Sequence, residues 1–384
     1  MKTLLTIIMA GALIFSPVTS SAQRNRQSND SRIPVVKAEP KSDSTKKAPQ
    51  GPVSIEKFIT KEASKMVGMT TAYKQDGKYY LTISDSLIGR DILMVSRVSQ
   101  SAADIRGSFS GYAGDQIGSG LYRFEKGPDN RIFLRKVSVR ERSQDSIMSM
   151  NILKSNLTPI IGSFPIKAWN EDKSLSIIDV TDFFNADSEE LYFSKRTKTS
   201  FKLGAQDKDK SYISSIRTYP INTEVTVVKT FARTTGGNAT YELNCSFVLL
   251  PEEPMTPRYY DERVGYFTTS YTDFDKNPHG VEKVQLITRW RLEPRPEDLE
   301  KYKRGELVEP AKPIVYYIDP STPAKWIPYL IQGVNDWEPV FRNAGFKNAI
   351  RAEMAPTPEQ DSTWSLEDAR YSAIVYKPSD IANA

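Results

Sequence analysis

Histidine and cysteine are almost absent from this chain of 384 residues, which holds one of each, His279 and Cys245. A single histidine excludes a zinc site built on two histidines one helical turn apart, and it leaves nucleophilic triads one candidate base. His279 lies between Pro278 and Gly280, which favours a plain turn residue. Cys245 cannot form an internal disulfide, and its apolar surroundings, YELNCSFVLL, favour a buried side chain over a reactive thiol.

Long apolar runs are also missing, apart from one at the N-terminus. Residues 1–22 join Lys2, a mostly apolar run over 4–15 and small residues ending at Ala22, which is the pattern of a cleavable signal peptide. An uncleaved anchor is the alternative, but the run is too short to cross a hydrocarbon core of about 30 Å. We therefore expect a periplasmic or secreted protein with no membrane span after cleavage.

The chain has no large excess of charge of one sign. It contains 52 Lys and Arg and 47 Asp and Glu, which gives a net charge of +5. The two signs are interspersed rather than gathered in a basic stripe, so the sequence predicts no nucleic-acid partner. Residues 23–52 are rich in Ser, Lys, Pro and Gln and lack aromatics. This composition predicts a disordered tether.

Two β-rich domains are expected next, a small one over 53–105 and an antiparallel one over 106–290. Hairpin signals stand at 75–77 (QDG), 127–130 (GPDN) and 236–238 (GGN). Broken alternation in RIFLRKVSV predicts a bulge, whereas sandwich and open roll remain equal alternatives. Ser54 and Thr181 are the predicted N-caps of two short helices.

The last part of the chain has an α/β pattern. Residues 291–312 read as a charged, proline-punctuated linker with a helical turn. In 313–384 we expect strands at 314–318, 350–354 and 372–376, the first two parallel, with a helix at 323–344 between them. Thr322 is its predicted N-cap. Pro328 and Pro339 predict a kink, or a start at Pro328.

Candidate chemistry is sparse. The glycines of GDQIGSG at 114–120 fit neither a phosphate loop nor a dinucleotide fingerprint and are expected to serve a flexible loop. Carboxylate pairs could support glycoside hydrolysis, although caps and turns are the ordinary interpretation. Those pairs are Asp182 with Asp187, and Asp273 with Asp275 beside Tyr271 and Phe274. The aromatics of 259–274 either line a groove for sugar or peptide or pack a core.

Three stretches resemble a known family. They are DGKYYLTISDSLIGRDILMVSRVS, PRYYDERVGYFTTSYTDF, and above all PIVYYIDPSTPAKWIPYLIQGVNDWEPVFRNAGF followed by SAIVYKPSD. Together they resemble the exported zinc-dependent metalloproteases of Bacteroidetes, in which domains of unknown function precede a zincin-type peptidase domain. The resemblance covers nearly everything after residue 54.

The resemblance implies a zinc-binding active-site helix with an HExxH-type motif after the matched strands. This chain ends at Ala384 without that helix, so no catalytic residue, metal ligand or cofactor-binding residue carries over, and zinc is expected only in full-length family members. We predict an α+β chain: mainly antiparallel β domains followed by an incomplete α/β zincin-like segment at 313–384.

The expected function is that of the N-terminal, non-catalytic portion of an exported zinc-dependent metallopeptidase, inactive alone. Its expected partners are a separately encoded C-terminal peptidase fragment and, by resemblance, a peptide or protein substrate. One alternative is a secreted β-rich binding module for peptide, glycan or a partner protein, with Tyr259, Tyr260 and Tyr271 on its surface. A carboxylate-based hydrolase is the other.

Overall fold

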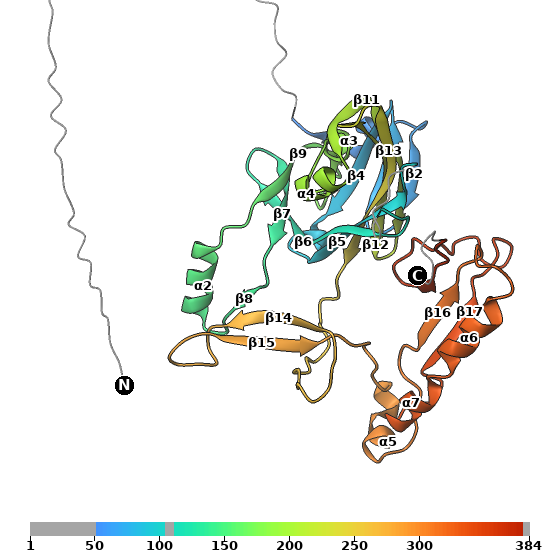
Figure 1. Cartoon of the computed structure of the whole chain (residues 1–384). Helices are drawn as coiled ribbons and strands as arrows, with labels where there is room; N and C mark the ends of the chain where they lie inside the picture. The colour runs from blue at the N-terminus through green and yellow to red at the C-terminus, as the bar shows by residue number, and fades with distance from the viewer. Residues whose placement is uncertain (1–50, 104–110, 379–384) are drawn as a thin grey trace, which may run out of the picture. The chain divides into compact units, whose positions relative to one another are not determined.

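The structure is a computed structural model that describes residues 51–103 and 111–378 (Figure 1). The chain divides into two units, 1–49 and 50–384, and the description below is of the second. The predicted signal peptide and all but the last two residues of the predicted tether lie outside the described residues.

Twelve strands form one large sheet, called the main sheet here. Its order is β11-β12-β13-β5-β6-β7-β9-β10-β4-β3-β2, and β1 pairs with β9. The strands are β1 (Val53–Ser54), β2 (Ser64–Val67), β3 (Thr71–Gln75), β4 (Lys78–Ser84), β5 (Ile92–Gln100), β6 (Gln116–Gly127), β7 (Arg131–Val137), β9 (Ile160–Trp169), β10 (Leu175–Asp179), β11 (Leu203–Tyr219), β12 (Asn222–Arg233) and β13 (Asn238–Leu249). Apart from the β1–β9 pair, every pairing in this sheet is antiparallel.

The two ends of the main sheet approach each other, so the sheet is nearly closed. The Met69 N–H donates to the Tyr219 oxygen at 2.6 Å, and the Thr218 hydroxyl donates to the Thr70 oxygen at 2.8 Å. The prediction of a mainly antiparallel β, α+β chain is confirmed. The predicted boundary near residue 105, however, falls inside this one sheet, because β4 pairs with β10 and β5 pairs with both β6 and β13. Turn motifs in the sequence indicate which neighbouring strands form hairpins, but they do not indicate which strands distant in sequence will pair.

The predicted hairpins are confirmed. Asp76 and Gly77, between β3 and β4, have φ values of 50° and 73°, the left-handed conformation that a tight hairpin turn requires. The register between β7 and β9 shifts at Leu134/Arg135, so the predicted irregularity in this strand is also present. The helix predicted after Ser54 is α1 (Ile55–Phe58), although the Ser54 side chain makes no capping bond.

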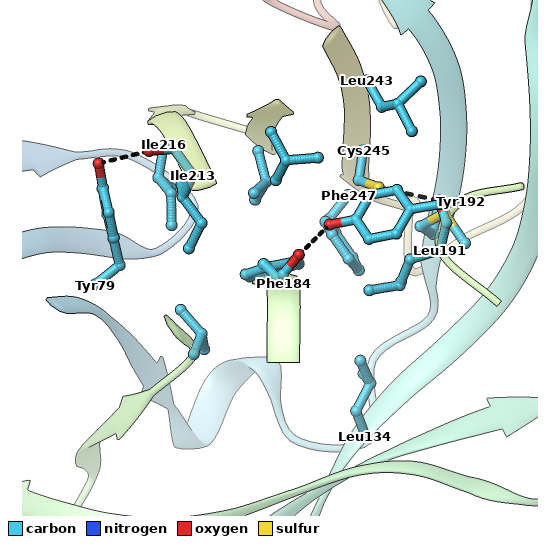
Figure 2. Close-up of a cluster of buried hydrophobic side chains, with 14 of the residues drawn as sticks. Tyr79, Leu134, Phe184, Leu191, Tyr192, Ile213, Ile216, Leu243, Cys245 and Phe247 are labelled. Atoms are coloured by element: carbon cyan, nitrogen blue, oxygen red, sulfur yellow. Dashed lines mark hydrogen bonds between the residues drawn. The ribbon is translucent and has the colours of Figure 1, made fainter. Parts of the chain in front are cut away.

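Helices α3 (Thr181–Asn185) and α4 (Lys195–Ser200) belong to a segment that packs against the inner face of the main sheet. Figure 2 shows Phe184, Leu191 and Tyr192 of this segment among side chains of the sheet strands. The N-cap prediction for Thr181 is wrong by one residue, since Val180 occupies that position. The Thr181 hydroxyl instead accepts the Tyr79 N–H at 2.8 Å, which ties α3 to β4.

A second sheet of three strands has the order β15-β14-β8. Its strands are β8 (Glu141–Arg142), β14 (Thr268–Asp273) and β15 (Glu282–Ile287), and α2 (Ser146–Ser155) follows β8. Helix α2 has no buried residue, and Asp145 caps it by accepting the Met148 N–H at 2.7 Å.

The third sheet, order β17-β16-β18, is entirely parallel. Its strands are β16 (Ile314–Ile318), β17 (Ile350–Met354) and β18 (Ser372–Ile374), and α6 (Ile327–Asn335) and α7 (Glu338–Asn343) connect the first two. The parallel pair is confirmed. The single helix at 323–344 and its Thr322 cap are wrong, whereas the alternative start at Pro328 agrees to within one residue, because α6 begins at Ile327 and α7 at Glu338. Pro328 and Pro339 both lie in a first turn, where the missing N–H costs no hydrogen bond.

The predicted linker 291–312 packs against α7 and the residues that precede β17. It carries a 3-10 turn (Pro296–Asp298) and α5 (Leu299–Lys303), which is the helical turn expected there. Val308 is buried with Phe346 and Ala349, and Tyr302 stacks on Phe346 with ring centroids 4.9 Å apart. Because most residues of 291–312 are charged or proline, the composition did not indicate that its few apolar side chains would be buried.

Candidate functional site

The carboxylates singled out from the sequence serve turns and ion pairs. Asp273 accepts the N–H groups of Asp275 and Lys276, and Asp275 accepts the Ser143 hydroxyl at 2.6 Å. Asp187 pairs with Lys198 at 2.6 Å, and Asp182 lies in the first turn of α3. The ordinary interpretation as turn residues is confirmed for Asp273 and Asp275, whereas Asp187 belongs to an ion pair.

His279 and Cys245 also take the ordinary roles expected of them. His279 is exposed in a turn, where its N–H donates to the Asn277 side-chain oxygen at 2.9 Å. Cys245 is completely buried, and this burial raises the pKa of its thiol to about 12. At neutral pH the thiol therefore stays protonated and unreactive.

The glycines of 114–120 are not all in a loop, so that prediction is wrong in part. Gly114 has a φ of +88° in a turn, but Gly118 and Gly120 lie within β6. A Cβ atom on Gly120 would stand 2.5 Å from the Tyr122 hydroxyl. Gly120 therefore leaves room for a buried tyrosine ring.

The aromatics of 259–274 are largely exposed rather than part of a core. Tyr259 is 61% exposed and Phe267 is 89% exposed, and Tyr266 lies between them in sequence at 54%. Tyr271 is half-buried, with the Arg142 guanidinium carbon 4.2 Å from its ring centroid. The packing interpretation is wrong for the three exposed rings, which leaves them available for contact.

A polar cleft that sequence reasoning missed lies on the outer face of the main sheet. On β12, Val225 and Val227 belong to the inner core, so Asn222, Glu224 and Thr226 face the other way. All three are buried nevertheless. The cleft measures 310 Å³ and is lined by residues of β5, β12, β13 and the segment 366–371.

Glu224 is the central group of this cleft. It is 3% exposed, and its Oε1 accepts the Asn222 Nδ2–H at 2.6 Å and the Ser246 hydroxyl. Burial raises the pKa of Glu224, while these hydrogen bonds and the charge of Arg97 oppose the rise. A buried carboxyl with a perturbed pKa in a cleft is the kind of group that functional sites use.

The segment over the cleft brings further acidic residues. Asp368 is 1% exposed and is held by Arg370, with the guanidinium nitrogen 2.6 Å from its carboxylate. Glu367 accepts hydrogen bonds from the Tyr219 hydroxyl at 3.0 Å and from Arg217 at 3.2 Å. These two carboxylates are thus held by their neighbours.

A weak signal for this site exists in the sequence. Glu224 and Lys229 interrupt NTEVTVVKTF, a stretch otherwise typical of a buried strand, and an unpaired charge buried there would be costly. This pattern indicates that Glu224 and Lys229 each need a polar or charged partner in the folded protein. It does not say which ones, because apart from Asn222 the partners are Ser246 and the main-chain oxygens of 184–186, which lie 22 or more positions away.

The described residues contain no group of three or more His, Cys, Asp or Glu side chains placed to hold a metal ion. Across the same ranges, no helix has the length and apolar character needed to cross a membrane.

Comparison with protein families matches two parts of the chain. Residues 52–101 match the family Domain of unknown function (DUF5118), and residues 114–295 match the family Domain of unknown function (DUF5117). The interval between the two matches contains the boundary expected near residue 105. Comparisons with curated proteins and with solved structures found no match.

Proposed function

We propose that this chain is the N-terminal, non-catalytic portion of an exported zinc-dependent metallopeptidase. The observation that carries the proposal is the parallel pair of β16 and β17, joined through α6 and α7. This pair lies in the stretch whose resemblance to the peptidase family is most specific. The sequence has one histidine, His279, in the turn between β14 and β15, so it offers no HExxH motif.

The metal content of the purified chain tests this proposal. We expect no stoichiometric zinc by plasma mass spectrometry and no hydrolysis of casein or of fluorogenic peptides, with or without zinc. Each hydrolysis assay is repeated with a metal chelator as a control. One zinc per chain together with chelator-sensitive hydrolysis would refute a non-catalytic role.

The same proposal includes a location and partners. The N-terminal sequence supports export to the periplasm or beyond the cell, and the resemblance suggests a separately encoded peptidase fragment and a peptide or protein substrate. Co-expression with the reading frame immediately downstream, followed by affinity purification, tests the fragment. Failure of the two products to co-purify, or absence of such a frame, would remove this partner.

A second candidate function is a binding module for peptide, glycan or protein, and the exposed rings of Tyr259, Tyr266 and Phe267 favour it. Exposed aromatics supply large contact areas at binding surfaces. Changing Tyr259 and Phe267 together to alanine should then weaken retention on immobilised casein peptides or polysaccharide without altering the melting temperature. Tyr212→Ala, at another exposed ring, is the control. Unchanged retention would count against this surface.

A further inference from the structure

Asn222 makes an unusual set of contacts across the outer-face cleft. Its Nδ2 donates to the main-chain oxygen of Glu367 at 2.8 Å, and its Oδ1 accepts the Ala369 N–H at 3.0 Å. A residue in a parallel strand pairs in the same way, since its N–H and its oxygen reach main-chain groups two positions apart on the neighbour. The Asn222 side chain thus holds the main chain on both sides of Asp368, where two turns meet, with the Asp368 N–H donating to the Ser365 oxygen and the Tyr371 N–H to the Asp368 oxygen.

Glu224 determines which way the Asn222 amide points. The carboxylate accepts the second Nδ2–H at 2.6 Å, so both amide donors are used and the amide oxygen is left facing Ala369. With the amide reversed, its oxygen would face the Glu224 carboxylate and the Glu367 oxygen, where neither can donate. Asn222 is completely buried, so each lost bond would leave an unpaired polar group.

Side chains at the end of β11 contact the same segment. The Tyr219 hydroxyl lies 2.9 Å from the Ser365 hydroxyl and 3.0 Å from a Glu367 carboxylate oxygen, which Arg217 also contacts at 3.2 Å. These contacts select a carboxylate two residues after a hydroxyl. Backbone recognition by Asn222 and side-chain recognition by Tyr219 and Arg217 therefore fall on one short stretch of chain.

We propose that the outer face of β11 and β12 is a docking site for a turn-forming stretch of polypeptide, and that its ligand is this chain's own segment 365–369, in which the Asp368 N–H donates to the Ser365 oxygen at 3.2 Å. This segment belongs to the connection between β17 and β18, so docking ties the third sheet to the main sheet. A second tie follows β18, where Lys377 pairs with Asp115. The inference does not depend on the peptidase proposal, since it concerns only how two parts of this chain are joined.

Hydrogen–deuterium exchange of the full chain, read by mass spectrometry, tests the docking site. Asn222→Ala removes both backbone contacts and should make amides of 365–371 exchange about tenfold faster, as expected for the loss of one or two net hydrogen bonds. Exchange in β6 and β7 should stay unchanged. Val228→Ala, on the same face of β12, is the matched control and should leave 365–371 protected.

A second variant keeps the test decisive if Asn222→Ala fails to fold. Ala369→Pro removes the N–H that Asn222 accepts without touching the main sheet, and Ala369→Gly retains that N–H as its control. Faster exchange over 365–371 in the proline variant, exceeding that in the glycine variant, supports docking. Equal exchange in these two variants would overturn the proposal, as would wild-type protection in a folded Asn222→Ala protein.

Discussion

Lys229 of β12 and Asn185 at the end of α3 are joined by a hydrogen bond of 2.6 Å from the lysine Nζ to the asparagine main-chain oxygen. The same ammonium donates to the oxygens of Phe184 at 2.9 Å and Ala186 at 3.1 Å, and it lies 4.7 Å from the Tyr192 ring centroid. Burial lowers the pKa of Lys229 to about 8. The lysine thereby satisfies the carbonyls that end α3 inside the main sheet.

Replacing this lysine by methionine should destabilise the protein strongly. Lys229→Met keeps the volume but removes the donor of the Ala186 oxygen, whereas the Phe184 and Asn185 oxygens keep the Tyr192 hydroxyl and the Gln206 amide. We expect a loss of about 1–3 kcal/mol in the free energy of unfolding. Urea denaturation followed by circular dichroism measures it. Lys210→Met, which breaks an exposed ion pair with Asp207, should change stability by less than about 0.5 kcal/mol. Equal effects of the two changes would contradict this role.

Two glycines of β6 should respond differently to a methyl group. Gly120→Ala puts a Cβ 2.5 Å from the hydroxyl of Tyr122, which is fully buried and hydrogen-bonded to Glu190, so the ring cannot move freely. We expect a loss of about 1–3 kcal/mol by thermal or urea unfolding. At Gly118 the nearest atom to the new Cβ is 3.9 Å away, so Gly118→Ala should be neutral or stabilising by about 0.5 kcal/mol.

The thiol of Cys245 should be unreactive in the folded protein. It is completely buried and its pKa is raised to about 12, so at pH 8 neither access nor ionisation favours attack on a disulfide reagent. We expect no release of thionitrobenzoate from the native chain and one equivalent after unfolding in guanidinium. A Ser362→Cys variant, altered at an exposed position, should release one equivalent when native. Rapid labelling of native wild-type protein would contradict the buried assignment.

Glu224 should make the free energy of unfolding depend on pH at values above those at which an ordinary glutamate titrates. Its pKa is raised in the folded protein because burial disfavours the charged form, so the native state binds the proton more tightly than the unfolded chain. Its contribution is therefore fully present below the unfolded pKa and is lost as pH rises through the folded value. Glu224→Gln should flatten this part of a stability profile measured by urea unfolding between pH 4 and 8. An identical profile for both proteins would contradict the assignment.

Local patterns predicted the hairpins and the ends of many strands. Asp76-Gly77 defines a turn through its own backbone preferences, and β16 and β17 begin and end at the residues expected from their apolar runs. Of the two interpretations of the prolines, a kink within one helix is wrong, whereas a helix start at Pro328 is correct to within one residue, because Pro328 and Pro339 each lie in the first turn of a helix. These features depend on residues close together in sequence.

The amino-acid sequence alone determined the mainly antiparallel β character, the parallel pair near its C-terminus and the unremarkable roles of His279 and Cys245. Only the tertiary structure decided that strands on both sides of residue 105 share one sheet, and that Asn222 holds the backbone of Glu367 and Ala369. The reason is sequence separation. Contacts between residues more than a hundred positions apart depend on how the whole sheet closes, and no local preference records that closure.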